Sequence, residues 1–573
     1  MLKYLNKFFN LIDSSKSNFV LILFLSIFVS IMDAIGILSI LPVVWIITDF
    51  ESFKNIILNL NFSVFNNIFE NSKSYIIIYF SLLSILCFSL KTLSSISIQY
   101  ILNKYAYTRM FNLRGRILNK ILELDYISFI NLNKNETLNI ILTTVHEFIE
   151  LSLRPLLRVI SELMILIILT LVLVFTNIIM TIIVISFLSI LSILYYASIR
   201  KKIYKYGAIS DNVNRKTIES ASNNINGFID LRIFKLTDTF LNIFIGNIKN
   251  YSNNKTKSTT IESIPRYLFE FSIFFLLNLI IIFYSFYGNY NFIINNISLL
   301  AIISIRLLPS ISIISSSLVA LKFSNYHVNK LYDFTSKLNN LDKQHITNKR
   351  ISIKSFENLR ISDLQFSYKN ISIFNKLNFQ IQKNEFIGLI GNSGSGKSTF
   401  IKIICQILAP NKGRIYINDI KINDLDFQNK ICLISQNNFL INGSIKENIS
   451  LCFEDNNIND EKIIKILKDV NLYEELLESN RDIYSLISSD GSELSGGQKQ
   501  RLIIARSLYF DREVFIFDEA TSSLDTENTK SVINTLINLK NKITLIYVSH
   551  NLKTLYFCDK IYELKNQKLD VYR

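Results

Sequence analysis

The stretch that decides the fold of the second half of the chain is Phe386-Ile387-Gly388-Leu389-Ile390-Gly391-Asn392-Ser393-Gly394-Ser395-Gly396-Lys397-Ser398-Thr399. Its first five residues are a short apolar run, which predicts a buried strand. The next nine fit the pattern GxxxxGK[ST] in the required setting of strand, loop and helix. Glycines there let backbone N–H groups close around phosphate oxygens, and the helix N-terminus faces the same charge. We therefore predict a phosphate-binding loop in which Lys397 reaches the terminal phosphates and Ser398 holds Mg²⁺.

A second buried strand is predicted at Val514-Phe515-Ile516-Phe517, and two carboxylates follow it directly. Asp518, at the carboxyl end of this strand, is placed to support Mg²⁺ through a coordinating water. Glu519 is placed beside it to activate an attacking water as a general base. The alternative is a pair of solvated carboxylates on a loop, and the four apolar residues before them argue against it.

The segment Leu494-Ser495-Gly496-Gly497-Gln498 opens a helical run and predicts another anion site made of backbone N–H groups. A single phosphate-binding loop does not need a second site of this kind. The segment resembles the signature of the ATP-binding cassette (ABC) family. In that family the second site serves the γ-phosphate of an ATP molecule held by a partner cassette.

Residues 351–573 carry the rest of that family's pattern. By this resemblance Tyr368 stacks on adenine, Gln436 links Mg²⁺ and water to the membrane domain, and His550 touches the γ-phosphate. Ser523-Leu524-Asp525 matches the loop that crosses the dimer interface. The resemblance implies that the cofactors are ATP and Mg²⁺, and that the catalytic residues are Glu519, His550 and Gln436.

The resemblance also divides the remaining site residues into groups. The ATP-binding residues are Tyr368, Gly391, Asn392, Ser393, Gly394, Ser395, Gly396, Lys397, Ser398, Thr399, Gln436 and Asp518. The residues that serve the partner's ATP are Leu494, Ser495, Gly496, Gly497, Gln498 and Asp525. Mg²⁺ is held by Ser398, Gln436 and, through water, Asp518. Because the chain has one cassette, a homodimer is the simplest assembly that completes both sites.

The first half of the chain differs sharply in composition. Of 573 residues, 49% are hydrophobic, and the long apolar runs are concentrated before about residue 325. A span takes about 20 apolar residues as a helix, and six candidates lie near 18–46, 75–100, 152–175, 178–198, 267–287 and 298–321.

We therefore predict a multidomain chain. An all-α transmembrane domain with six spanning helices occupies residues 1–335, and its place ahead of the cassette resembles the exporter branch of the ABC family. A linker follows at 336–350, and an α/β P-loop nucleotide-binding domain occupies 351–573.

Loop charge predicts the orientation of these spans. Lys and Arg cluster before the first span and after the second and fourth, so both termini are expected in the cytoplasm. The polar stretches 101–150 and 199–264 read as helical extensions that end in short crosspieces touching the ATPase. The net charge of +15 is then explained by Lys and Arg on the cytoplasmic face rather than by a nucleic-acid site. We expect a multi-pass protein of the cell inner membrane, with its nucleotide-binding domain in the cytoplasm.

Cations inside the apolar runs point to the cargo. A charged residue in a span is costly and tends to face a cavity or a partner, so Arg306, Lys91 and Arg266 are candidates for a cavity that binds an anionic group. The membrane half resembles the flippases for lipid-linked oligosaccharides in bacterial protein N-glycosylation. One departure is Ile313, where that family has a further arginine. The alternatives are an exporter of drugs, peptides or other amphiphiles and a soluble cassette ATPase, and the six apolar runs exclude the latter.

One further segment reads in two ways. Residues 49–73 follow the first span and carry phenylalanines at helical spacing. They fit a helix lying on the outer membrane surface and, equally, a packed loop.

Overall fold

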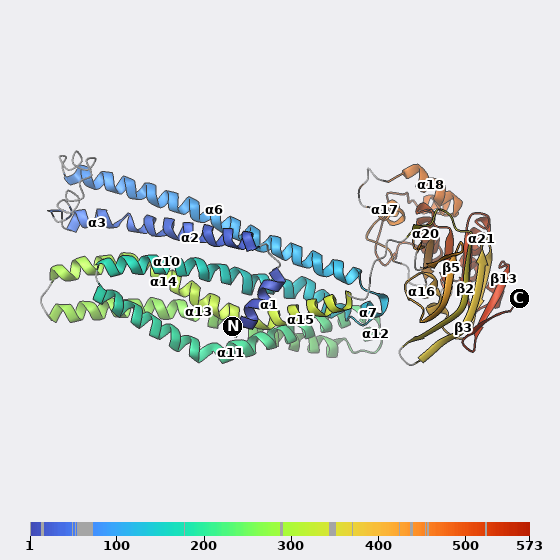
Figure 1. Ribbon diagram of the computed structural model, residues 1–573, viewed down its shortest axis with the longest axis horizontal. Coiled ribbons are helices and arrows are strands. Elements are labelled where there is room, and N and C mark those ends of the chain that lie inside the picture. Colours follow the sequence, from blue (N-terminus) through green and yellow to red (C-terminus); the bar gives the residue numbers. More distant parts are fainter. Residues whose placement is uncertain are drawn as a thin grey trace. The chain divides into compact units, whose positions relative to one another are not determined.

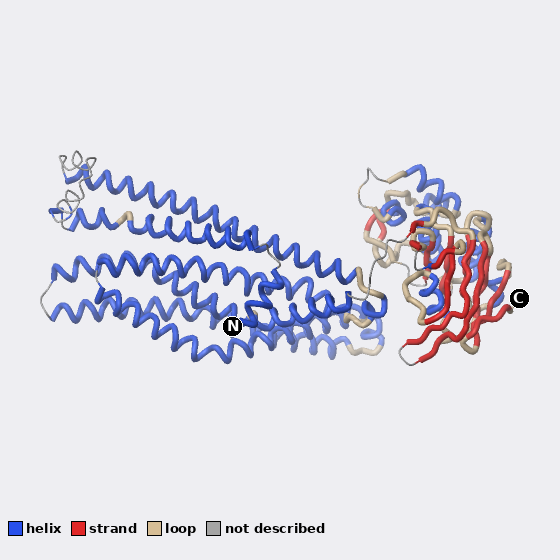
Figure 2. The backbone as a smooth tube through the Cα atoms, viewed as in Figure 1, coloured by secondary structure: helices blue, strands red, loops and turns tan. Residues whose placement is uncertain are grey.

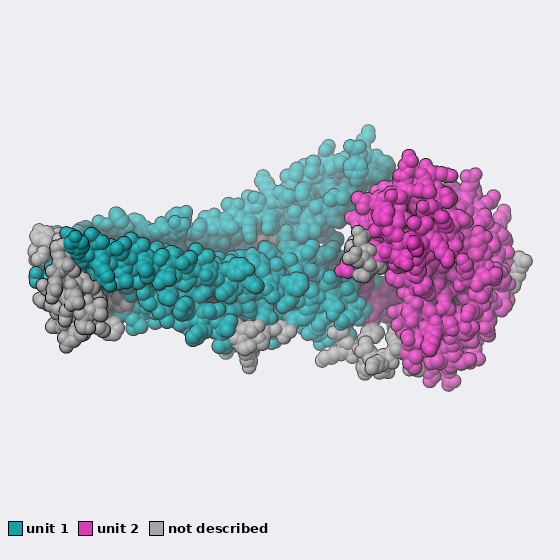
Figure 3. Space-filling view, turned by 90° about the horizontal axis from the view of Figure 1, so that it is seen from above, with its two compact units in different colours: residues 1–124, 130–343 teal, residues 125–129, 344–573 magenta. Residues whose placement is uncertain are grey.

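The protein, seen in a computed structural model, is described over residues 2–12, 16–48, 50–51, 53, 73–176, 178–286, 290–342, 351–368, 371–422, 425–435, 439–452, 454, 458–521 and 524–572. It forms two compact units (Figure 3). The first comprises residues 1–124 and 130–343, and the second comprises residues 125–129 and 344–573. Figure 2 shows that the first unit is helical and that the strands belong to the second.

The first unit is built of long helices lying side by side (Figure 1). Its described helices are α1 (Leu2–Ile12), α2 (Lys16–Leu38), α3 (Leu41–Thr48), α6 (Lys73–Leu122), α8 (Lys134–Asn139), α9 (Val145–Phe148), α10 (Arg154–Thr176), α11 (Ile178–Asn226), α12 (Phe228–Ile233), α13 (Thr237–Phe286), α14 (Tyr290–Phe323) and α15 (Asn325–Asp342). Two π-helical segments, Ile140–Thr144 and Ile149–Leu153, lie between α8, α9 and α10.

Each of the six predicted spans falls on a helix, the first on α2 and α3 and the others on α6, α10, α11, α13 and α14. Among the described residues, four helices are long and apolar enough to cross a membrane. They lie within Val20–Ile47, Lys73–Leu122, Thr181–Ile199 and Thr237–Ile282. The number becomes five if the bent pair Leu307–Phe323 and Asn325–Leu341 counts as one span. The total of six stays a prediction.

The helices continue well beyond the apolar runs. α6 has 50 residues, which at 1.5 Å per residue is about 75 Å and far more than the roughly 30 Å of a hydrocarbon layer. The polar stretches after the second and fourth spans are therefore helical, as the sequence predicts. Two short helices, α7 (Tyr126–Ile130) and α12, follow the ends of α6 and α11. Residues 125–129 belong to the second unit, where the Tyr126 ring lies 4.8 Å from the Lys402 ammonium.

Packing between α10, α11, α13 and α14 forms one of the buried clusters of the first unit. Ile165, Leu169 and Leu173 of α10 meet Leu188 of α11 and Phe269 of α13 there. In a lipid surrounding, helix association rests on close packing rather than on removal of water. Large aliphatic and aromatic side chains that interdigitate therefore hold these helices together.

The second unit is built on two large sheets. The six-stranded sheet has the order β14-β13-β4-β12-β11-β8, and its strands are β4 (Phe386–Ile390), β8 (Ile431–Ser435), β11 (Val514–Asp518), β12 (Thr544–Val548), β13 (Lys560–Lys565) and β14 (Lys568–Val571). Only β14 is antiparallel to its neighbour among these described pairs. The four-stranded antiparallel sheet has the order β3-β2-β5-β6, with β2 (Asn358–Tyr368), β3 (Ile371–Gln382), β5 (Lys412–Ile417) and β6 (Ile420–Lys421).

Smaller elements surround these sheets. Two short strand pairs join β1 (Ile351–Ser352) to β7 (Leu425–Asp426) and β9 (Gly443–Ser444) to β10 (Leu486–Ile487). The helices of the unit, besides α7, are α16 (Lys397–Ile404), α17 (Ile445–Ser450), α18 (Asp460–Asp469), α19 (Tyr473–Glu478), α20 (Gly496–Tyr509) and α21 (Thr526–Asn538).

Burial explains why the central strands of the larger sheet have apolar sequences. Every residue of β4 and of β12 is buried, and two hydrophobic clusters include side chains from both strands. Because β4, β8, β11 and β12 run parallel, their carboxyl ends meet at one edge. The loops that carry the predicted catalytic residues leave from that edge.

Two predictions concern segments near the limits of the described residues. α15 continues to Asp342, so the first part of the predicted linker at 336–350 is helical. Most of the segment predicted at 49–73, including Phe62, Phe65 and Phe69, lies outside the described residues, which resume at Lys73.

Candidate functional site

The predicted phosphate-binding loop connects β4 to α16. Gly396 precedes the helix with φ of +106°, and a Cβ there would lie 2.7 Å from Cγ2 of Ile373, so both backbone and space require glycine. The Lys397 ammonium donates to the carbonyl oxygens of Gly391 at 2.6 Å and Asn392 at 3.1 Å. Burial lowers the pKa of Lys397, while the charges of Glu519 and Asp518 oppose that change. The loop therefore holds its lysine folded back against its own backbone.

The strand β11 brings Asp518 to this loop. The Ser398 hydroxyl, in the first turn of α16, donates to the Asp518 carboxylate. Burial raises the pKa of Asp518, with a further rise from the adjacent Glu519 charge. The structure thus brings together two hard oxygen donors, Ser398 and Asp518, beside the loop.

The pair of Glu519 and His550 lies next to Lys397. The His550 Nε2 atom is 2.5 Å from Oε1 of Glu519, and the same carboxylate oxygen is 3.9 Å from the Lys397 ammonium. Glu519 has φ of +54°, an unusual conformation for a residue with a side chain. Such a conformation persists where the surrounding structure enforces it, often at functional sites. Both residues border a cavity of about 520 Å³.

A hydrogen bond that was not predicted from the sequence connects the segments that carry Glu519 and His550. The Thr521 Oγ1 and the Tyr547 hydroxyl are 2.5 Å apart. Thr521 lies two residues after Glu519, and Tyr547 lies three before His550 on the buried strand β12, with 1% of its surface exposed. A tyrosine following Leu545 and Ile546 in a buried strand was the available signal, because a buried phenol needs a partner.

The predicted partner-facing segment forms the N-terminus of α20. Ser495 and Gln498 form a capping box, each accepting a hydrogen bond from the other's backbone N–H. A Cβ at Gly496 would lie 2.5 Å from a methyl group of Leu524, so a larger residue there would displace that side chain. Asp525 caps α21 by accepting from the backbone N–H of Asn528. Leu494 is buried and Gly497 lies beside Asn528, so all six predicted residues gather at the starts of α20 and α21.

An ion pair that was not predicted from the sequence connects α20 to α19. Arg501 is buried and its two terminal nitrogens each donate to one oxygen of Glu475 at 2.6 Å. One of these nitrogens also donates to the backbone carbonyl of Asn471. This two-pronged geometry is the strongest arrangement available to an arginine and a carboxylate.

The structure says less about two other predicted ATP-site residues, Tyr368 and Gln436. Tyr368 ends β2, is partly buried and packs edge-on against Phe366 with ring centroids 4.9 Å apart. Gln436 lies outside the described residues, directly after the end of β8 at Ser435. Asn392, Ser393, Gly394, Ser395 and Thr399 lie in the loop or the first turn of α16.

The candidate cargo cations lie in two different helix groups. The Lys91 ammonium in α6 is 3.5 Å from Oδ1 of Asp33 in α2. Arg266 in α13 is 2.9 Å from Oε1 of Glu270 and, together with residues of α14 that include Ile313, borders a cavity of about 440 Å³. Arg306 lies in α14, and its side chain is outside the described part of the structure. Each described cation therefore has a carboxylate neighbour that the sequence reasoning did not foresee.

Structural similarity identifies the class of fold to which the protein belongs. A solved structure of a bacterial Atm1-family ABC exporter with ATP bound superposes with a TM-score of 0.67, covering 94% of each chain at 15% sequence identity. The protein thus has the fold of an ABC exporter, with a helical membrane-type unit followed by an α/β nucleotide-binding unit. Residues 374–522 match the family model described as ABC transporter, so the second unit contains an ATP-binding cassette.

Sequence comparison finds relatives of several kinds. The chain is 36% identical over 207 residues to an uncharacterized ABC transporter ATP-binding protein of Sinorhizobium fredii, covering 35% of each chain. It is 33% identical over 215 residues to the ATP-dependent lipid A-core flippase of Francisella novicida, covering 37% of this chain and 36% of that one. It is 34% identical over 224 residues to the lactococcin-G-processing and transport ATP-binding protein of Lactococcus lactis, covering 38% and 32%. The chain therefore matches about a third of the length of these relatives.

Proposed function

We propose that the protein is one half of an ATP-driven exporter, which pairs with a second copy and moves a lipid or lipid-linked sugar across the cell inner membrane. The observation that carries the proposal is the 2.5 Å contact of Glu519 with His550, beside Lys397, at the carboxyl edge of a parallel sheet. The same chain contains at least four helices apolar enough to span a membrane. A hydrolytic site and a membrane domain on one chain suit coupled transport.

The chemistry assigned to this site is attack of water on the γ-phosphate of ATP. Such a transfer needs positioning and charge stabilisation more than covalent chemistry. Lys397 supplies the cation for the terminal phosphates, and the N–H groups of the loop contact their oxygens. Glu519 accepts the proton of the attacking water. His550 orients the Glu519 carboxylate and contacts the γ-phosphate.

The donors at Ser398 and Asp518 fit Mg²⁺. This ion prefers a few protein oxygens together with water and phosphate oxygens, and the hydrogen bond between the two side chains already brings their oxygens together. Ser398 would ligate the ion directly and Asp518 through water, with Gln436 as a further ligand proposed from the sequence. When bound, Mg²⁺ neutralises charge that develops on the phosphates.

Dimerisation completes the proposed site. The helix α20 has 14 residues, begins with Gly496 and Gly497 and is capped by Ser495, so its N-terminal N–H groups and dipole favour an anion. We assign this end to the γ-phosphate of ATP bound by the partner copy. Tyr368 would stack on adenine, and Asp525 would lie at the interface. A twofold dimer then has two equivalent ATP sites.

The proposed cargo is a lipid or a lipid-linked sugar. One relative is named a lipid A-core flippase, and Arg306, Arg266 and Lys91 are proposed to meet an anionic head group. The neighbours Asp33 and Glu270 offset part of that positive charge. An exporter of drugs, peptides or other amphiphiles is the second candidate, favoured by the relative named for lactococcin-G processing and transport.

A cargo panel tests the proposal. The purified full chain would be reconstituted in liposomes, and ATPase stimulation and ATP-dependent translocation would be measured for a lipid-linked oligosaccharide, lipid A-core, a phospholipid and a bacteriocin peptide. We expect one of the lipids to be translocated, and Arg306→Gln to lower that translocation while basal ATPase activity persists, with Arg306→Lys as the matched control. Translocation of the peptide alone would replace the lipid assignment with the second candidate.

A further inference from the structure

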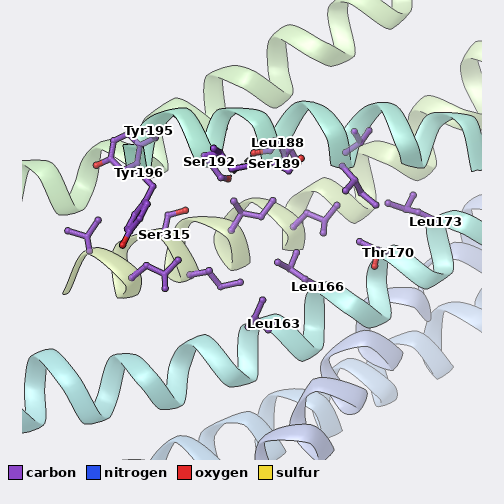
Figure 4. A pocket seen from close by; sticks show the side chains of 18 residues that line it. Leu163, Leu166, Thr170, Leu173, Leu188, Ser189, Ser192, Tyr195, Tyr196 and Ser315 are labelled. Carbon is purple, nitrogen blue, oxygen red and sulfur yellow. Dashed lines mark hydrogen bonds between the residues drawn. The ribbon is translucent and has the colours of Figure 1, made fainter. Parts of the chain in front are cut away.

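A long apolar cavity lies inside the membrane-type unit, between α10, α11 and α14 (Figure 4). Its volume is about 330 Å³. It is lined along α11 from Val184 to Tyr196, which is about 18 Å of helix at 1.5 Å per residue. Figure 4 shows Tyr195 and Tyr196 at one end and Thr170 and Leu173 at the other. The cavity is therefore elongated along the helices.

Three hydroxyls of the lining, those of Thr170, Ser189 and Ser192, donate to carbonyl oxygens of their own helices. The Thr170 hydroxyl donates to the carbonyl of Ile167 at 2.9 Å, and the Ser192 hydroxyl to that of Leu188 at 2.8 Å. Ser189 likewise donates to the carbonyl of its own helix at Ser186. These hydroxyls are thus satisfied without a ligand, and the described lining contains no charged side chain. A peptide or sugar placed here would lose hydrogen bonds to water at several kcal/mol per polar group.

The two ends of the cavity differ. Tyr195 donates its hydroxyl to the carbonyl of Ile261 on α13 at 2.5 Å, which fixes its ring at one end. Four residues after Tyr196 the sequence of α11 continues Arg200-Lys201-Lys202. Tyrosines with adjacent cations are typical of the boundary between hydrocarbon and lipid head groups. The tyrosine end therefore lies at the head-group level, and the leucine end lies deep in the hydrocarbon.

We propose that this cavity holds one acyl chain of the transported lipid, with the lipid's anionic head group at the level of Tyr196. This inference rests on the proposed lipid export. Entry of a chain from the bilayer gains little from the hydrophobic effect, because lipid tails are as apolar as the cavity wall. Selection would come from the shape of the cavity and its lack of charged side chains among the described lining residues. The chain would leave the cavity when the ATP-bound dimer closes.

Photolabelling of the full chain in liposomes tests the proposal. The probe is phosphatidylglycerol with a diazirine at the end of one acyl chain, and adducts are mapped by mass spectrometry without nucleotide and after trapping with MgATP and vanadate. We expect adducts on cavity residues such as Leu166 and Leu188 without nucleotide, and at least a several-fold loss after trapping. Adducts confined to outward residues such as Ile182 would overturn the proposal. Cavity adducts unchanged by trapping would indicate a resident lipid and overturn the cargo assignment.

Two neighbouring residues provide matched variants. Ser189 lines the cavity, whereas Ile190 does not line it and is 57% exposed. Ser189→Trp should lower cavity labelling several-fold, and Ile190→Trp should leave labelling and ATPase activity unchanged. Equal labelling in both variants would contradict the assignment, and the wild-type result stands even if Ser189→Trp fails to fold.

The acyl-chain site and the proposed lipid export can be refuted independently of each other. Nucleotide-sensitive cavity labelling with no lipid translocation would refute the export proposal and keep the acyl-chain site. Lipid translocation with no cavity labelling would refute the site and keep the export proposal.

Discussion

The hydrogen bond between Tyr547 and Thr521 leads to a sharp prediction. Tyr547→Phe removes one oxygen from a side chain that is 1% exposed and keeps the ring that stacks on Phe517 at 5.7 Å. Thr521 then loses its 2.5 Å partner. The expected cost is about 1–2 kcal/mol, because a partly buried hydroxyl is left unsatisfied. For a domain of this size that corresponds to a fall of roughly 3–6 °C in its unfolding temperature.

Catalysis should respond as well. The hydrogen bond connects the segment after Glu519 to the strand before His550, so its loss lets these two side chains, proposed as catalytic, move apart. We expect ATP turnover to fall by up to about tenfold, equivalent to about 1.4 kcal/mol, with little change in KM because Lys397 and the loop are untouched. Full-length protein in detergent would be assayed for ATPase kinetics and thermal unfolding.

A double-mutant cycle isolates this contact. Thr521→Val and Tyr547→Phe would be combined, with Tyr562→Phe as the control for loss of a phenol from a nearby strand. The double variant should cost at least 0.5 kcal/mol less than the sum of the single variants. Costs that simply add, or a Tyr547→Phe effect equal to that of Tyr562→Phe, would refute the reasoning.

Three further predictions follow from other contacts. Arg501→Ala should destabilise the cassette by about 2–3 kcal/mol, less than for a fully buried pair because Glu475 is partly exposed. Thermal unfolding would measure this loss, and Arg501→Lys should restore only part of the lost stability. Burial raises the pKa of the Cys405 thiol to about 12, so it should resist maleimide at pH 7.5 in the folded protein and react after denaturation, as followed by mass spectrometry. Lys91→Met or Asp33→Asn alone should lower the yield of folded protein in detergent, because each removes one member of an ion pair between apolar helices and leaves the other charge without it. The double variant should recover the yield, and an equal loss in all three variants would contradict the pairing.

Local sequence was sufficient to predict the strands and loops of the ATP site. The apolar runs before Gly391 and Asp518 indicated buried parallel strands, and parallel strands bring their carboxyl ends together. The contact between Ser398 and Asp518 follows from that topology. Glycine at 396 followed from the loop pattern, and the structure adds the reason in the close approach of Ile373.

Contacts between distant side chains were beyond the sequence. Nothing in the spacing of Lys91 and Asp33 shows that α6 and α2 bring them within 3.5 Å. The same holds for Arg501 and Glu475, which lie on α20 and α19. A single sequence gives periodicity and motifs, whereas these pairs depend on how separate helices pack. The stretch predicted as a linker begins inside α15, which extends to Asp342. The buried Leu331 and Leu338 lie seven residues apart on one face of this helix.

The central claim is that the site around Glu519 hydrolyses ATP and that hydrolysis drives lipid movement. The most direct measurement compares wild type and Glu519→Gln in proteoliposomes, following phosphate release and lipid translocation in the same samples. The account predicts that the variant binds ATP, hydrolyses it at least about a hundredfold more slowly, accumulates as a closed dimer and ceases to translocate lipid. Unchanged phosphate release, or lipid translocation that continues without it, would contradict the account.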